Sequence, residues 1–360
     1  MPTPSAQPNA VAGELLRDLT ASPDAYPQKL DLIRDAVLLV RLDAAGYRAA
    51  SFLDDRILGP ATQGAWLPVK LVADAARRAG NGRPVHFIFH TGHVGSTLVS
   101  RLLDETDDVL SLREPLPLRT LVEANAVLDE PESLLSDTQF SAHLEMFMTL
   151  WSRGYAATRA VVVKATSSAG RLAVPILSRH IASRAIYMNL GAEPYLATLL
   201  AGQNSPLDLR GHGPGRIRSL QARARTPLAP LHALSLGELA AMSWLAESWA
   251  QRDALQEYPA RVIALDFDWF LANVEEGMRR ILSHFDLPAN PGYLGRVARS
   301  PVLASYSKAP EFAYTPAMRT EIQNESRRVN REEIRKGMAW LECIARADAR
   351  AAAVVTGGGL

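Results

Sequence analysis

The segment at 84–103, PVHFIFHTGHVGSTLVSRLL, constrains the fold more than any other part of the chain. Its first six residues are an apolar run typical of a buried strand. A loop with two glycines follows, and the residues from Thr97 onward have the spacing of a helix with one apolar face. A strand that passes through a glycine loop into a helix predicts an α/β fold.

The same alternation continues downstream. Apolar runs at 109–112, 160–165, 185–190 and 261–267 predict further strands, with helices expected between them. Repeated alternation predicts a three-layer fold with a mainly parallel central sheet. Because ligands of such sheets bind beyond the carboxyl ends of the strands, candidate site residues are expected at 90–97, 113–119, 164–168 and 190–194.

Four regions are expected along the chain. Residues 1–20 predict a disordered tail, and 21–80 an N-terminal extension packed on the core, with a strand near Ala36 and helices at 46–55 and 68–79. Residues 81–347 form the expected α/β domain, and 348–360 a flexible tail.

The composition narrows the possible functions. With 39 Lys and Arg against 38 Asp and Glu, the chain lacks the basic surplus typical of nucleic-acid binding. Its single cysteine cannot form an internal disulfide or a thiolate zinc cluster, and no HExxH, CxxC or EF-hand pattern predicts a metal site. No run of 18 apolar residues predicts a membrane span, and the first residues do not resemble a signal peptide, so a cytoplasmic location is expected.

The loop between the first strand and its helix has the features of an anion site. Gly92 and Gly95 allow a tight turn and a close approach of the backbone to a ligand. Free N–H groups at the helix start and the hydroxyls of Ser96 and Thr97 would donate hydrogen bonds to an anion. The alternative is an ordinary turn with a serine cap. The G-x-x-x-x-G-K-[ST] pattern of nucleotide triphosphatases is absent, because Ser96 stands where its lysine would be.

The run His93-Val94-Gly95-Ser96-Thr97, followed by LVSRLL, resembles the sulfotransferase family, a branch of the P-loop fold. Members carry [RK]-x-G-[ST]-T after their first strand, and His93 stands in the place of the basic residue. The segments 112–121, 160–167 and 261–287 are similar to later parts of the family in order and spacing, so the resemblance covers about residues 84–345.

This resemblance implies a bacterial-type sulfotransferase that transfers a sulfuryl group from 3′-phosphoadenosine 5′-phosphosulfate to a hydroxyl or amine of a small molecule or glycan. No metal is expected. The implied donor-binding residues are Gly92, His93, Val94, Gly95, Ser96, Thr97, Leu98 and Thr198. Thr198 is included because Ala192 and Leu200 stand where the family has the arginine and serine that hold the 3′-phosphate. The arginine-rich segment 207–232 is either a substitute source of phosphate contacts or a solvated loop.

Four residues are candidates for catalysis. Glu114 is the expected general base for the acceptor, with a structural salt bridge to Arg113 or Arg119 as the alternative. His90 is a rival base. His93 would stabilise charge on the leaving oxygen, best when protonated, and its reference pKa is near 6.5. Lys164 ends a strongly apolar strand and either touches a phosphate or extends to the sheet edge.

Two other classes of function stay open. One is a P-loop phosphotransferase that uses ATP and Mg²⁺, and the other is a non-catalytic member of the fold that binds a nucleotide or another anion. The expected partners are a nucleotide donor and an unidentified acceptor, without nucleic acid, and a homodimer is left open.

Overall fold

The computed structural model describes residues 7–80, 82–309 and 311–357. The strands are β1 (Ala25–Asp31), β2 (Ala36–Arg41), β3 (Gly64–Pro68), β4 (Val85–His90), β5 (Val109–Arg113), β6 (Ala160–Lys164), β7 (Ala185–Asn189) and β8 (Val262–Asp266). The last five form a parallel sheet in the order β5-β6-β4-β7-β8, and the first three form an antiparallel sheet. The predicted α/β class with a parallel central sheet and an N-terminal extension is therefore confirmed.

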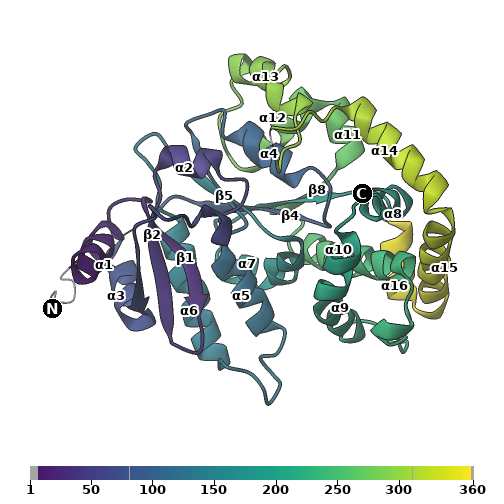
Figure 1. The fold of residues 1–360 in the computed structure, drawn as a ribbon, viewed down its shortest axis with the longest axis horizontal. Coiled ribbons are helices and arrows are strands. Elements are labelled where there is room, and N and C mark those ends of the chain that lie inside the picture. Colours follow the sequence, from purple (N-terminus) through teal and green to yellow (C-terminus); the bar gives the residue numbers. More distant parts are fainter. Residues whose placement is uncertain (1–6, 81, 310, 358–360) are drawn as a thin grey trace. The chain divides into compact units, whose positions relative to one another are not determined.

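Helices occupy most of the remaining described chain (Figure 1). They are α1 (Gln7–Asp18), α2 (Ala44–Ala49), α3 (Val69–Arg78), α4 (Ser96–Leu103), α5 (Leu116–Asn125), α6 (Asp137–Trp151), α7 (Ala173–Arg179), α8 (Ala192–Leu200), α9 (Ser205–Gln221), α10 (Leu236–Glu257), α11 (Phe267–Ala272), α12 (Val274–His284), α13 (Pro291–Val297), α14 (Pro316–Val329), α15 (Arg331–Ala347) and α16 (Ala349–Thr356).

The strands of the parallel sheet follow from their apolar sequences. Every residue of β4, β5, β6 and β7 is buried, as expected for strands that are covered on both faces.

The chain divides into two compact units. The first contains Met1–Phe87 and Leu103–Ala165, and the second contains Ile88–Leu102 and Thr166–Leu360. The sequence of β4 belongs partly to each.

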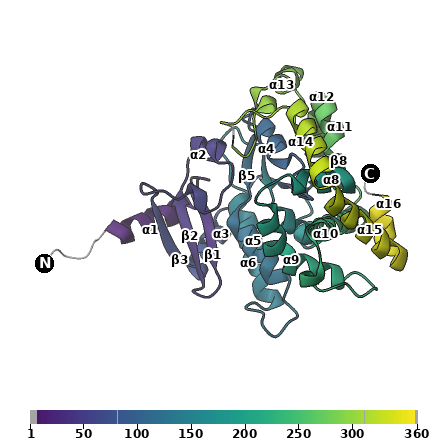
Figure 2. The same ribbon diagram turned by 45° about the vertical axis from the view of Figure 1, so that its right-hand side comes forward.

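The first unit contains the antiparallel sheet, with α1 and α3 packed against it (Figure 2). Within α1, Leu15 is fully buried, and Leu19 is buried just after the helix. The described part of the expected disordered tail 1–20 is therefore mostly helical, while residues 1–6 lie outside the described residues. The apolar contacts of these leucines stabilise a helix that its polar first turn did not predict.

The second unit is organised around α10, which packs against α7, α8, α9, α15 and α16. Ser235 and Glu238 form a capping box at its start. The segment expected to be a loop at 207–232 is helical as far as Gln221, where α9 ends. Leu209, Gly213 and Leu220 are buried on one face of α9, so packing on α10 outweighs the poor helix propensity of its glycines and Pro214.

The C-terminal segment also differs from the prediction. Residues 348–360 were expected to be flexible, yet Asp348 caps α16 by accepting from the backbone N–H groups of Arg350 and Ala351. Ala351 and Val354 are buried. In the described ranges, no helix combines the length and the hydropathy needed to cross a bilayer.

Candidate functional site

The loop after β4 has an uncommon backbone conformation. Gly92, His93 and Gly95 have φ angles of 104°, 55° and 69°. A left-handed φ is easily adopted by glycine and uncommon for a histidine. Left-handed residues in a turn direct successive N–H groups toward one side, and such a concavity binds anions. The loop therefore has the backbone of an anion-binding nest at the start of α4.

Packing also requires a glycine at position 95. A Cβ atom there would lie 2.0 Å from a ring carbon of Phe267, the first residue of α11. The aromatic ring thus holds the loop from one side, and any side chain at this position would displace it. In the sequence, this contact is visible only as the glycine itself.

Two hydroxyl side chains stand at the start of α4. Ser96 is 4% exposed and Thr97 is 2% exposed. Within the described residues, the Thr97 Oγ1 atom has no hydrogen-bond partner. A buried hydroxyl without a partner costs free energy, so this atom is available to a ligand on the loop.

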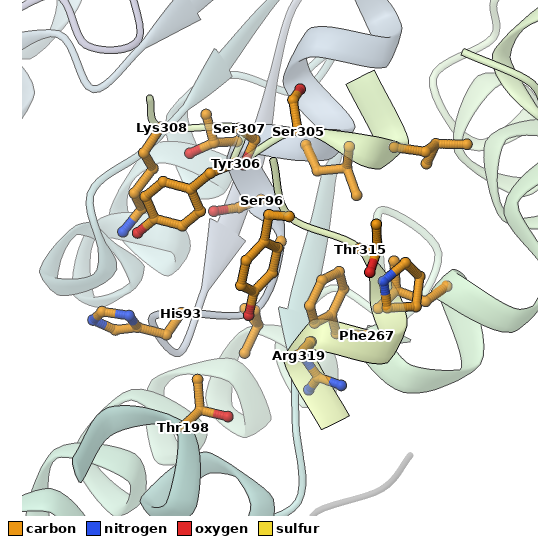
Figure 3. A pocket seen from close by; sticks show the side chains of 18 of the residues that line it. His93, Ser96, Thr198, Phe267, Ser305, Tyr306, Ser307, Lys308, Thr315 and Arg319 are labelled. Carbon is orange, nitrogen blue, oxygen red and sulfur yellow. The ribbon is translucent and has the colours of Figure 1, made fainter. Parts of the chain in front are cut away.

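A cavity of 400 Å³ lies over this loop. Figure 3 shows side chains from the loop, from α8, from α11, from α14 and from the segment before α14 around one space. The lining residues are 90, 93–98, 198, 201, 202, 267, 271, 302, 303, 305–308, 312–316, 319 and 322. Apart from the loop, most of this surface is apolar or aromatic.

Arg319 of α14 is one of the charged residues that line the cavity (Figure 3). It is 7% exposed, and its Nη1 atom lies 2.6 Å from Asp268 Oδ1. Its guanidinium also lies over the Phe267 ring, 5.0 Å from the centroid. The Nη2 atom has no hydrogen-bond partner in the described part of the chain. A buried guanidinium nitrogen without a partner is a donor suited to an anionic group.

The predicted donor-binding residues mostly meet at this cavity. His93, Val94, Gly95, Ser96, Thr97 and Leu98 line it, and Gly92 gives the loop its first left-handed turn. The rival base His90 also lines it and is 5% exposed.

Thr198 lines the cavity as well, but its hydroxyl is engaged. It donates to Pro194 O at 2.8 Å and accepts from Gln323 Nε2 at 2.8 Å. Thr198 therefore contributes shape to the cavity, and its hydroxyl proton is used within the helix. Ala192 is the first residue of α8 and carries no polar side chain.

The other two catalytic candidates form a pair in the first unit. Lys164 ends β6, is 1% exposed, and its Nζ atom makes a short ion pair with Glu114 Oε1. Glu114 follows β5 with a φ of 54°, and its N–H donates to Lys164 O at 2.6 Å. Glu114 does form a salt bridge, which was the alternative to a role as general base, but its partner is Lys164 and not Arg113 or Arg119. Arg113 pairs with Asp104, and Arg119 pairs with Glu123.

The N-terminal extension contributes to the surroundings of this pair. Arg113, which is 1% exposed, donates from Nε to Ala50 O at 2.7 Å, and its O atom accepts from Leu53 N at 2.7 Å. Phe52, which precedes Leu53, places its ring 5.8 Å from Lys164 Nζ and 3.6 Å from the Arg56 guanidinium. The Arg56 side chain, whose pKa is raised chiefly by its hydrogen bond to Asp54, also interacts electrostatically with Glu114.

No group of three or more His, Cys, Asp or Glu side chains among the described residues is placed to hold a metal ion. Comparisons by sequence return neither a matching protein family nor a matching curated protein.

Comparison with solved structures returns sulfotransferases. A sulfotransferase domain from the curacin biosynthetic pathway is 12% identical over 72% of this chain and 98% of that chain, with a TM-score of 0.40. Mouse sulfotransferase SULT7A1, complexed with PAP, is 10% identical over 75% and 88%, with a TM-score of 0.40. Sulfotransferase STF9 from Mycobacterium avium is 12% identical over 91% and 97%, with a TM-score of 0.38.

The likeness of this chain to these three sulfotransferases is one of fold, at identities of 10–12%. No property of theirs is carried over to this chain, so the role of each residue has to be argued from the site itself.

The cavity over the loop includes residues that the sequence did not single out. Phe267, Tyr306 and Arg319 are the clearest examples. Arg319 lies in a helix that carries charges of both signs, a pattern that predicts a solvated face. The cluster of aromatic residues at Tyr306, Phe312 and Tyr314, set between prolines, is the one local signal that could have pointed to this segment.

Proposed function

We propose that this protein is a sulfotransferase that binds 3′-phosphoadenosine 5′-phosphosulfate and transfers its sulfuryl group to a hydroxyl or amine of a small molecule or glycan. One observation carries the proposal. Two buried polar atoms without partners among the described residues, Thr97 Oγ1 and Arg319 Nη2, belong to residues that line the same cavity.

The cavity suits a nucleotide with two anionic groups. The loop and the start of α4 offer backbone N–H groups and hydroxyls to one anion. Arg319 offers its guanidinium to the second anionic group, in place of the arginine that the sulfotransferase family has at the position of Ala192. Phe267 and Tyr306 supply aromatic surface for a purine, and 400 Å³ lies in the usual range of ligand cavities.

The donor, when bound, supplies an activated sulfuryl group and leaves as adenosine 3′,5′-bisphosphate. In this proposal His93 donates a hydrogen bond where charge develops on the leaving oxygen. Glu114 accepts the proton of the acceptor hydroxyl or amine. Lys164 holds the Glu114 carboxylate in place through their ion pair. Glu114 and the loop follow β5 and β4, two strands of one parallel sheet.

Calorimetric titration of the purified protein with adenosine 3′,5′-bisphosphate, beside ATP with Mg²⁺, tests the donor assignment. The bisphosphate should bind with a Kd on the order of micromolar. Ser96→Ala combined with Thr97→Ala should weaken binding, and Arg319→Gln should weaken it about 10-fold or more, because a hydrogen bond to a charged group is lost.

Arg328→Gln is the matched control for Arg319→Gln, since Arg328 lies on the same helix and its side chain is 74% exposed. It should bind the bisphosphate as the wild type does. Absence of bisphosphate binding with tight Mg²⁺-dependent ATP binding would instead support a phosphotransferase. Tight bisphosphate binding without transfer to any hydroxyl or amine acceptor would support a non-catalytic binding protein.

A further inference from the structure

A buried cluster of charged side chains in the second unit is not explained by the proposed roles. Glu247, in the middle of α10, is 1% exposed. Its Oε1 atom accepts hydrogen bonds at 3.1 Å from both Arg171 Nη2 and Arg216 Nε. The side chains of these arginines are 10% and 7% exposed. Two guanidinium groups thus share one carboxylate oxygen in a place that is largely closed to water.

The formal charges of this cluster do not cancel. Two cations face one anion, and burial raises the pKa of Tyr195 to about 12, so that this neighbour adds no negative charge. The pKa of Tyr187 is likewise raised by burial. Arg223 and Asp253, two further charged groups that act on Tyr187, form an ion pair of their own. The cluster therefore holds one positive charge in excess, which is costly in a low-dielectric interior.

Arg216 connects this cluster to the anion-binding loop. Its Nη2 atom donates to Ser167 Oγ at 3.3 Å, so one lone pair of that hydroxyl is used and its proton stays free to be donated. A Cβ atom on Gly92 would lie 3.8 Å from Ser167 Cβ and 3.6 Å from Tyr195 Oη. Ser167, whose hydroxyl accepts a hydrogen bond from Arg216, therefore lies next to Gly92, the first glycine of the loop.

We propose that Arg216 is a positioning residue of the anion site. Arg216 directs the Ser167 hydroxyl toward the loop, and the excess positive charge of its cluster is balanced when an anion binds to the loop. The inference rests on the loop being the anion site of the proposed function, and it does not depend on which anion binds. At an effective dielectric constant near 20, a single charge several ångströms away changes anion affinity by about 10-fold or more.

The test is calorimetric titration of five proteins with sodium sulfate and with adenosine 3′,5′-bisphosphate. They are the wild type, Arg216→Gln, Arg216→Lys, Ser167→Ala and the control Arg218→Gln, which removes the same charge from an exposed position two residues along α9. Arg216→Gln should weaken both anions about 10-fold, Arg216→Lys and Ser167→Ala less, and Arg218→Gln should match the wild type.

The melting temperature of each protein without ligand separates this role from a purely structural one. Arg216→Gln leaves Arg171 and Glu247 as a balanced pair, so its melting temperature should stay close to that of the wild type. A lower melting temperature together with unchanged affinity for both anions would overturn the proposal. If Arg216→Gln does not fold, wild-type affinity of Ser167→Ala for both anions overturns it.

The two ligands distinguish this proposal from the proposed function. If sulfate binds and depends on Arg216 while the bisphosphate does not bind, the nucleotide assignment fails and the role of Arg216 holds. If both bind the wild type and Arg216→Gln equally well, the role of Arg216 fails and the nucleotide assignment holds. If the wild type binds neither, both fail.

Discussion

The loop from Gly92 to Thr97 and the pair formed by Glu114 and Lys164 are built in different ways. The loop owes its chemistry to backbone geometry and small side chains, and it contains no acidic residue. The pair owes its chemistry to two long charged side chains that already satisfy one another. Both regions include a non-glycine residue with a left-handed φ, His93 and Glu114.

This difference assigns the two regions different tasks. In the described part of the chain, the buried Thr97 hydroxyl of the loop has no hydrogen-bond partner, so the loop is suited to binding a ligand. The pair needs no ligand for charge balance, so it is suited to moving a proton to or from a bound group. Left-handed strain at Glu114 costs stability and points to a function for its position.

The largest expected effect comes from a variant that changes the loop and leaves the pair of Glu114 and Lys164 intact. Gly95→Ala should abolish binding of adenosine 3′,5′-bisphosphate, because the added Cβ combines a φ of 69° with a 2.0 Å approach to the Phe267 ring. Gly80→Ala is the matched control. Gly80 also has a φ of 69°, but no atom lies within 4 Å of the added Cβ.

The control should lose about 1–2 kcal/mol of stability from backbone strain and bind the bisphosphate normally. Thermal melting and calorimetry check both variants. Normal bisphosphate binding by folded Gly95→Ala would show that the loop geometry is not what binds the nucleotide.

Sequence reasoning succeeded where the information is local. The five strands of the parallel sheet are continuous apolar runs, and the loop is a contiguous motif, so both could be predicted. It missed β1 because Pro27 interrupts the strand pattern, and β3 because that strand is short and largely exposed. It missed α1 because the contacts that bury Leu15 are tertiary.

The rest of the site depends on long-range packing. Arg319 reaches the cavity from a helix more than 200 residues beyond the loop, and Arg216 reaches Ser167 from a helix that the glycines of its sequence did not predict. Nothing in the charge pattern separates these two arginines from the exposed Arg218 and Arg328. Only the fold shows which arginines are buried.

The second prediction, with an effect of intermediate size, concerns a variant that changes the pair of Glu114 and Lys164 and leaves the loop unchanged. Glu114→Gln keeps the shape of the side chain and removes the base, so kcat for sulfuryl transfer should fall about 10²–10³-fold. Binding of adenosine 3′,5′-bisphosphate should not change, because the loop is intact. Steady-state kinetics with an acceptor found by screening, together with calorimetry, measure both quantities.

Glu123→Gln is the control for this experiment, since Glu123 is exposed on α5 and pairs only with Arg119. Its kcat should equal that of the wild type. An unchanged kcat in Glu114→Gln would remove Glu114 from the mechanism and leave His90 as the candidate base at the cavity.

The smallest expected effect concerns the Thr97 hydroxyl, which should lower the stability of the ligand-free protein and strengthen ligand binding. Thr97→Val keeps the shape and removes the buried Oγ1 atom that has no partner among the described residues, so stability without ligand should rise by about 1 kcal/mol. Affinity for the bisphosphate should fall about 5-fold, because that hydroxyl no longer donates to the anion.

Thr91→Val is a close control: Thr91 is fully buried, and its Oγ1 atom also lacks a partner in the described ranges, but Thr91 is not among the residues that line the cavity. It should gain similar stability and bind normally. If both variants gain stability and both bind normally, the Thr97 hydroxyl does not contact the ligand, and the loop binds through its backbone alone.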